Sequence, residues 1–208
     1  MLNSKSISYS YDGINELCFP DLKLKQSQSL LILGESGIGK TTLIYILAGL
    51  LRPNSGTLEI NSIKINELNS NEIDRFRGDN IGMVFQFPRF VNNISILDNL
   101  CLSQYLSKNK KDVIRATQLL AQVGLEHKKH NKAKELSQGE QQRAAIALSV
   151  VKKPKLILAD EPTSSLDDVN CAKTISLLKE QAALTNASLI IITHDHRLKS
   201  QFNNHIYL

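Results

Sequence analysis

The chain has 208 residues and a mass of 23.2 kDa, with 42% hydrophobic and 22% charged residues. This composition is typical of a globular protein and excludes collagen-like, disordered and repetitive classes. The formal net charge of +5 comes from 25 Lys and Arg against 20 Asp and Glu, which is a modest bias. Its densest cluster, residues 127–134, lacks the aromatic side chains that stack on bases, so we interpret it as a solvated loop.

The cysteines and the apolar stretches exclude further classes. Cys18, Cys101 and Cys171 are odd in number and far apart, which argues against a disulfide framework or a zinc site and favours reduced thiols. The longest apolar stretches, residues 43–51 and 144–151, fall short of the roughly 18 to 20 residues that a membrane span requires. The N-terminus also lacks the apolar region of a secretory signal, so we expect no export.

The first part of the chain predicts strands around one buried helix. Alternation over residues 6–11, a turn at residues 12–13 and an apolar run at 30–33 predict strands, the last of them buried. Residues 41–51 are apolar on nearly all sides, as in a buried helix, and we expect Pro53 to end it. Residues 57–65 predict a hairpin, and 81–85 a buried strand that leads into Gln86.

The second part predicts helices and then alternating strands and helices. Residues 88–150 are largely helical in pattern, with an amphipathic segment at 112–124 and a second helix that begins near Ser137. Residues 156–161 and 188–193 are continuous apolar runs, typical of buried parallel strands, and a helix over 169–184 connects them. A last strand is expected at 205–208, which completes an α/β chain.

The segment GESGIGKT, residues 34–41, satisfies the pattern of a phosphate-binding loop. Glycines at 34, 37 and 39 let the backbone N–H groups turn inward without Cβ clashes. Lys40 reaches the outer phosphates, and Thr41 offers a hydroxyl to Mg²⁺. The candidate nucleotide-binding residues are therefore Gly34, Glu35, Ser36, Gly37, Ile38, Gly39, Lys40, Thr41 and Thr42.

Two carboxylates, Asp160 and Glu161, end the strand LILADE. The carboxyl end of a parallel strand faces the crevice in which doubly wound sheets bind ligands. Asp160 is therefore a candidate ligand of the Mg²⁺ that Thr41 also contacts, and Glu161 a candidate base that orients or deprotonates water. The alternative is that both acids merely cap the following helix.

The segment LSQGEQQR, residues 136–143, permits two interpretations that are compatible. Ser137 and Glu140 have the spacing of a capping box that opens a helix. The same helix N-terminus, with Ser137 and the unhindered N–H of Gly139, is also suited to an anion such as phosphate.

These motifs resemble those of the ATP-binding subunits of ABC transporters, and the resemblance covers essentially the whole chain in the right order. It consists of the phosphate loop, a glutamine loop at Gln86, a signature motif at 136–140, the Asp160–Glu161 strand end, the SSLD segment at 164–167 and a switch histidine at His194. The resemblance implies an α/β P-loop NTPase fold with a RecA-like core, an N-terminal antiparallel β subdomain and an inserted α-helical subdomain. We expect the core at residues 1–87 and 151–208 and the helical signature subdomain at 88–150.

The resemblance also implies roles for individual residues. Two subunits, identical or different, meet head to tail, and Ser137 and Gly139 of one contact the γ-phosphate held by the other. Gln86 contacts the metal or the attacking water, His194 contacts the γ-phosphate, and Asp167 lies at the dimer seam. An aromatic side chain stacks on adenine, with Tyr11 as the first candidate and Tyr9 as the alternative.

The function implied is MgATP hydrolysis that drives a separate transmembrane permease, from the inner face of the cell membrane and without direct nucleic-acid contact. The form LS-x-GE followed by QQR resembles the lipoprotein-releasing and macrolide-export group, whereas SSLD looks more like importers of polar solutes. The alternatives are a soluble ABC-type ATPase acting on nucleic acid, ribosomes or iron–sulfur assembly, and a P-loop nucleotide kinase. The kinase would have no use for LSQGE, and the sequence names neither cargo nor direction.

Overall fold

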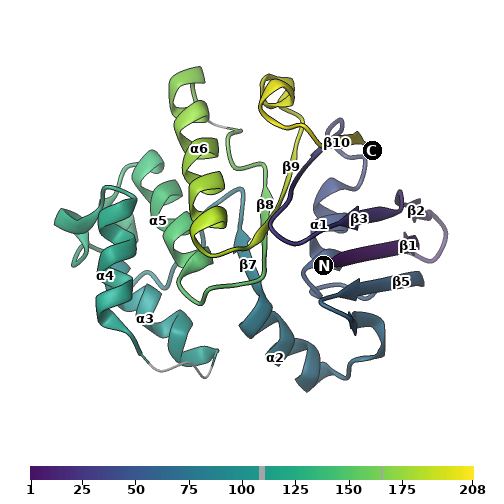
Figure 1. Ribbon diagram of the computed structural model, residues 1–208, viewed down its shortest axis with the longest axis horizontal. Helices are drawn as coiled ribbons and strands as arrows, with labels where there is room; N and C mark the ends of the chain where they lie inside the picture. The colour runs from purple at the N-terminus through teal and green to yellow at the C-terminus, as the bar shows by residue number, and fades with distance from the viewer. Residues whose placement is uncertain (108–110, 165) are drawn as a thin grey trace.

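A parallel sheet forms the centre of the computed structural model, which describes residues 1–107, 111–164 and 166–208 (Figure 1). Its strand order is β10-β4-β9-β8-β7, and every neighbouring pair in it is parallel. The strands are β4 (Ser29–Leu33), β7 (Ile81–Val84), β8 (Leu156–Asp160), β9 (Ser188–Thr193) and β10 (His205–Tyr207). The order is that of a doubly wound α/β sheet, so the predicted fold class is confirmed.

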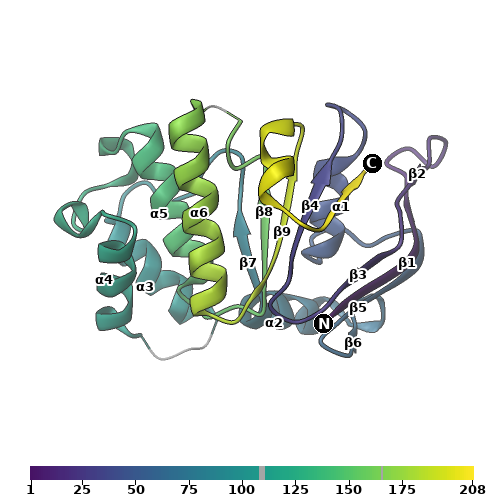
Figure 2. The same cartoon turned by 45° about the horizontal axis from the view of Figure 1, so that its top comes forward.

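An antiparallel sheet built mainly from the N-terminal residues lies beside the parallel one (Figure 2). Its strands are β1 (Leu2–Tyr9), β2 (Leu17–Cys18), β3 (Leu22–Leu24), β5 (Ser55–Ile60) and β6 (Ile63–Lys64). Strand β1 pairs with β2, β3 and β5, and β5 returns to pair with β6. The expected N-terminal β unit and the hairpin at 57–65 are therefore present.

The helices divide between the two faces of the parallel sheet. They are α1 (Lys40–Leu47), α2 (Ser70–Asn80), α3 (Ile96–Leu106), α4 (Val113–Gln122), α5 (Gln138–Val150) and α6 (Asp168–Leu184), with short 3₁₀ turns η1 (Ile65–Glu67), η2 (Glu126–Lys128), η3 (Ala133–Glu135) and η4 (His196–Gln201). Helix α1 lies on the side of the antiparallel sheet, and α3 to α6 lie on the other side (Figures 1 and 2). No helix within the described ranges is long and apolar enough to span a bilayer.

Two hydrophobic cores follow from the alternation of side chains along the buried strands. In β9, Leu189 and Ile191 join the core that contains α3 to α6, whereas Ile190 and Ile192 join the core that contains α1 and the antiparallel sheet. All four side chains are fully buried. A strand covered on both faces needs apolar residues at every position, which is why its sequence shows a continuous run.

Helix α1 ends earlier than the sequence predicted, at Leu47 and not at Pro53. Gly49 adopts φ 68°, its N–H donates to Ile46 O, and the N–H of Leu50 donates to Tyr45 O. This pair of bonds is a Schellman motif, which ends a helix at a glycine in the left-handed conformation. The glycine therefore outweighs the apolar run that continues after it.

Helix α2 was not predicted at all, because only Ile73 and Phe76 of its eleven residues are buried. So few apolar positions give almost no helical periodicity. The signal that marks it is a capping box, in which the Asn69 side chain accepts from the N–H of Glu72 and Glu72 accepts from the N–H of Asn69.

We predict that Gly82→Ala destabilises the protein, because β7 and α5 approach each other too closely for a side chain at this position. A Cβ on Gly82 would overlap the Ser149 carbonyl oxygen and lie 3.0 Å from Pro154 Cγ. Overpacking of this kind costs about 1–3 kcal/mol of unfolding free energy, measurable by urea denaturation.

Gly78→Ala is the matched control, since it lies within α2 and its Cβ would meet nothing nearer than 3.8 Å. We expect this control to stabilise the helix by about 0.5–1 kcal/mol. Equal stability of the two variants would contradict the packing argument.

Candidate functional site

The candidate site lies at the carboxyl edge of the parallel sheet, where three strands end together. The register pairs Leu33 of β4 with Thr193 of β9, and Ile192 of β9 with Asp160 of β8. The next residues along the chain are Gly34, His194 and Glu161. Parallel pairing therefore brings the glycine loop, the acidic pair and the predicted switch histidine to one edge.

The glycine loop, residues 34–39, turns sharply from β4 into α1. Gly37 and Gly39 have φ 86° and 100°, values that only glycine adopts readily. Gly39 is the N-cap of α1, where no side chain caps the helix and no acidic residue lies in the first turn. The N–H groups at this helix end and its positive dipole are thus available to an anion.

Lys40 is the first residue of α1, and its ammonium group lies under the loop. Its Nζ donates to the carbonyl oxygens of Gly34 and Glu35, both at 2.8 Å, and lies 3.5 Å from Glu161 Oε1. The residue is 6% exposed. A buried ammonium needs such partners, because desolvation otherwise favours its neutral form.

Glu161 is 8% exposed and is held by several donors besides Lys40. Thr193 Oγ1 donates to Oε2 at 2.8 Å, His194 N donates to Oε1 at 3.2 Å, and His194 Nδ1 lies 2.9 Å from Oε1. Its backbone φ is 46°, in the left-handed region that a glutamate rarely adopts. Backbone strain of this kind is concentrated at functional sites.

Asp160, directly before Glu161, is buried with one oxygen unpaired. Its Oδ1 has no hydrogen-bond partner among the residues described, and the side chain is 4% exposed. Burial raises the pKa of this carboxyl, a hydrogen bond from Thr41 acts in the opposite direction, and the charge of Glu161 raises it further. A carboxylate oxygen beside a hydroxyl is the donor set that Mg²⁺ prefers.

The remaining predicted residues around the loop lie as follows. Glu35, Ser36 and Ile38 line a cavity of about 570 Å³ together with Gly34, His194, His196, Tyr207 and Leu208. Tyr11 is 69% exposed, and its hydroxyl lies 3.0 Å from Thr42 Oγ1. The Tyr9 ring packs edge-on against Tyr11 at 4.8 Å between centroids.

Gln86 is exposed two residues after the end of β7, at the same edge of the sheet. Of the SSLD segment, Ser165 lies outside the described residues. Asp167 is the N-cap of α6 and accepts from the N–H of Asn170 at 2.9 Å.

The predicted signature residues are not brought to the loop within one chain. Ser137 is the N-cap of α5, and the capping box with Glu140 is present. Gly139 lies in open space, since a Cβ there would meet only Arg143 Nη1, at 3.9 Å. Helices α5 and α1 belong to the cores on opposite faces of the sheet. The two motifs therefore begin helices that pack into different cores.

Comparison with known proteins agrees with this arrangement. The family model described as "ABC transporter" matches residues 20–164. The chain is 36% identical over 202 residues to the lipoprotein-releasing system ATP-binding protein LolD of Pseudoalteromonas translucida (strain TAC 125), covering 95% of this chain and 87% of that one. It is 37% identical over 185 residues to LolD of Saccharophagus degradans (strain 2-40 / ATCC 43961 / DSM 17024), covering 88% and 81%.

The same agreement holds for solved structures. A dimeric structure of a post-hydrolysis state of the ATP-binding cassette MJ0796, bound to ADP and Pi, superposes with a TM-score of 0.90 at 31% identity, over 100% of this chain and 94% of that one. CbiO1 from Clostridium perfringens, part of the ABC transporter complex cbiONQ, superposes with a TM-score of 0.81 at 31% identity, over 93% and 78%.

The chain belongs to the ABC transporter family. Within this family it is an ATP-binding subunit that hydrolyses ATP and powers a separate membrane permease through ATP-driven dimerisation. The predicted resemblance to the lipoprotein-releasing group agrees with the relatives found. The cluster at the edge of the sheet described above is the candidate nucleotide site of this subunit.

Sequence reasoning did not single out the residues that hold this ABC site together. Asp195 Oδ1 accepts from Arg197 Nε at 2.8 Å, and Oδ2 accepts from Thr163 Oγ1 at 3.3 Å. Arg197 also pairs with Asp168 at the start of α6. The Asp195 N–H donates to Thr193 Oγ1, which in turn donates to Glu161. The strand-end sequence THDHR was the available signal, because short polar side chains after a strand commonly bond to its loop.

We predict that Thr193→Val lowers the unfolding free energy by about 2 kcal/mol, because it leaves a buried carboxyl oxygen of Glu161 without its hydroxyl donor. Thr193→Ser keeps the hydroxyl and loses one methyl group, which costs about 0.8 kcal/mol. Urea denaturation without nucleotide compares the two variants. A valine variant as stable as the serine variant would show that this hydrogen bond does not stabilise the fold.

Proposed function

We propose that residues 34–42 bind the phosphates of ATP and that Lys40 pairs with the outer phosphates. The observation that carries the proposal is the arrangement around Lys40. Its buried ammonium group contacts the glycine loop, and the N-terminus of α1 next to it has no side-chain cap. An incoming phosphate replaces the carbonyl oxygens of Gly34 and Glu35 as acceptor of the Lys40 ammonium group, and it also accepts from the loop N–H groups. Positioning and charge neutralisation are most of what phosphoryl transfer asks of a protein.

Asp160 and Thr41 are the residues we assign to Mg²⁺, with Gln86 as a third ligand to the metal or to the attacking water. The unpaired, buried Oδ1 of Asp160 supports this assignment, since a bound cation satisfies such an oxygen. Mg²⁺ binds phosphate oxygens and a few protein oxygens in octahedral geometry. When bound, it neutralises the charge that develops on the transferred phosphoryl group.

Glu161 is the residue we assign as the base that accepts a proton from the attacking water. Its contacts with Thr193 and His194 fix the carboxylate at the edge of the sheet, which supports a positioned base. His194 is 52% exposed in its side chain and contacts Glu161, so we assign it to the γ-phosphate next to that carboxylate. In this position His194 can orient both the Glu161 carboxylate and the γ-phosphate.

Tyr11 is the side chain that we assign to adenine, with Tyr9 supporting its ring. The exposed ring and the bond from its hydroxyl to Thr42 support this assignment, because they leave a face of the ring open beside the loop. Stacking of a base on an aromatic ring contributes about 1–3 kcal/mol.

Ser137 and Gly139 are the residues we assign to the nucleotide of a second subunit, with Asp167 at the seam. The separation of α5 and α1 on opposite faces of the sheet supports action between subunits. Two copies of the chain, or this chain and a related subunit, then enclose two ATP molecules. Residues 88–150 form the helical unit that presents the signature, a division supported by the packing of α3, α4 and α5 against one another.

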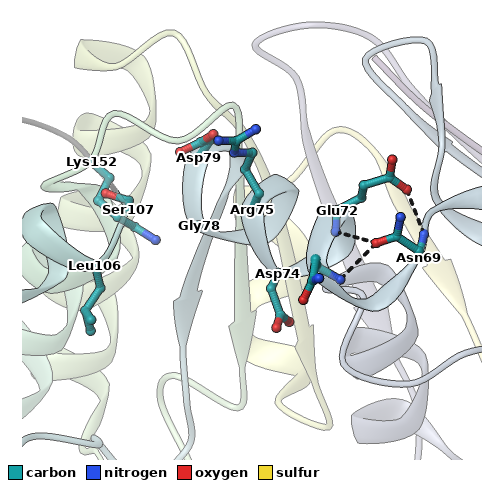
Figure 3. Close-up of a pocket in the computed structure, with 10 residues that line it drawn as sticks. Asn69, Glu72, Asp74, Arg75, Gly78, Asp79, Leu106, Ser107 and Lys152 are labelled. Carbon is teal, nitrogen blue, oxygen red and sulfur yellow. Dashed lines mark hydrogen bonds between the residues drawn. The ribbon is translucent and has the colours of Figure 1, made fainter.

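The membrane partner is, in this proposal, a permease of the kind served by lipoprotein-releasing ATP-binding proteins. A cavity of about 940 Å³ supports a docking place, since it lies away from the glycine loop, between α2 and the C-terminal ends of α3 and α5 (Figure 3). Asp74, Asp79, Arg75 and Lys152 line it with both signs of charge. We place the subunit at the inner face of the membrane, held there by the permease.

We predict that Glu161→Gln retains MgATP binding and loses ATP hydrolysis. The amide keeps the shape of the side chain and removes the base, which costs about a hundredfold to ten-thousandfold in rate. Hydrolysis loosens the dimer, so the variant accumulates as an ATP-bound dimer, measured as a doubling of mass by size-exclusion chromatography with light scattering. Turnover within a few-fold of the unmodified chain, alone or with its permease, would refute the assignment.

The same variant gives the test of the signature when Ser137→Arg is added to it. An arginine at the N-cap fills the space that the opposite nucleotide needs, while the loop of the same chain is unchanged. We expect normal ATP binding to the monomer and no doubling of mass. A double variant that still dimerises would show that LSQGE acts only as a helix cap.

A further inference from the structure

Lys128 lies outside every motif of the family and yet contacts the signature. It is the last residue of η2, in the basic segment interpreted above as a solvated loop. Its Nζ lies 2.6 Å from Glu140 Oε1, a hydrogen-bonded ion pair between side chains that are 31% and 16% exposed. The basic segment is therefore fixed to the first turn of α5 by one specific contact.

Glu140 adds a negative charge where an anion is to be bound. The carboxylate accepts from the N–H of Ser137 at 2.8 Å through its other oxygen, Oε2. It therefore lies at the N-terminal end of α5, beside the hydroxyl and N–H groups assigned to the opposite nucleotide. Lys128 and the Ser137 N–H lower the pKa of Glu140 to about 2, so the carboxylate is ionised at neutral pH. Like charges at such short range repel, and the region between two subunits screens them less than bulk water does.

Among the cations that the structure describes, Lys128 is the one that forms an ion pair with Glu140. Arg143, whose Nη1 would lie 3.9 Å from a Cβ on Gly139, donates from its Nε to the Val123 carbonyl oxygen. Lys134, in the same basic segment, is exposed and forms no ion pair among the residues that the structure describes. The 2.6 Å contact thus gives Glu140 its own counter-charge within the chain.

We propose that Lys128 is a positioning residue of the ATPase, which neutralises Glu140 so that the N-terminus of α5 accepts the γ-phosphate held by the opposite subunit. The inference rests on the proposed function, in which Ser137 and Gly139 act between subunits. It adds a residue and an electrostatic role to that site. In this arrangement Glu140 caps the helix and Lys128 cancels its charge.

The test removes the charge from each partner in turn, in the Glu161→Gln chain that traps ATP. Lys128→Met keeps much of the side-chain length and leaves Glu140 unneutralised. We expect it to raise the MgATP concentration at half-maximal dimer formation by about tenfold, the effect of about 1.4 kcal/mol. ATP binding to the monomer, measured with the Ser137→Arg chain, is unchanged. Lys134→Met is the matched control, with the same change of charge in the same segment and no expected effect.

Adding Glu140→Gln to Lys128→Met separates a charge role from a merely structural one. The double variant lacks the ion pair. If Lys128 acted only by holding its segment against α5, dimer formation would therefore remain impaired. Under our proposal the repulsion is gone, and the MgATP concentration at half-maximal dimer formation returns to within about twofold of the parent. Lys128→Arg keeps the positive charge, so it also keeps the parent's midpoint. A double variant as impaired as Lys128→Met, or a Lys128→Met chain with the parent's midpoint, overturns the proposal. If Ser137→Arg also dimerises normally, the proposed function fails with it.

Discussion

The arrangement of the site depends on one buried cation, the ammonium of Lys40. It lies beneath a loop whose glycines leave no side chain between its backbone and a ligand, and it is held by two carbonyl oxygens and by Glu161. Each of these partners offers only a partial or a shared negative charge. A phosphate group supplies more, and it also meets the open N-terminus of α1. Lys40 therefore has partners within the chain, and a phosphate would neutralise its charge more fully.

Around this cation the strand ends form a connected network. Glu161 is bonded to Thr193, Thr193 to Asp195, and Asp195 to Thr163 and Arg197, which pairs with Asp168 at the first turn of α6. The carboxylate assigned as base is thus linked by successive hydrogen bonds to the segment assigned to the dimer seam. The signature begins a helix that packs on the other face of the sheet, in keeping with the proposal that it acts on the nucleotide of a second subunit. The residues assigned to hydrolysis and those assigned to dimerisation are therefore connected through the same strand ends.

Some features of this arrangement are readable from the sequence, and others are not. The loop at 34–41 and the strand end Asp160–Glu161 are each a run of consecutive residues. Their residue types and the elements next to them indicate what they bind. Ser137 was equally clear, because a capping box is a local pattern. The Lys128–Glu140 pair joins residues 12 positions apart, and Asp195 meets Thr163 across two strand ends, 32 positions apart. Contacts of this kind depend on how elements pack, and no local pattern encodes them. Helix α2 was missed because only Ile73 and Phe76 are buried, which leaves almost no periodicity, although a capping box marks its start.

The measurement that tests the account most directly is the affinity of the full chain and of its Lys40→Met variant for MgATP, by isothermal titration calorimetry. Methionine retains the length of the side chain and removes the charge, while Glu161→Gln serves as a control that removes the facing carboxylate. The account predicts that Lys40→Met weakens binding by about a hundredfold or more, the loss of a charge-assisted contact of about 3 kcal/mol, and that Glu161→Gln retains it. Binding by Lys40→Met within a few-fold of the unmodified chain would contradict the central role of this cation.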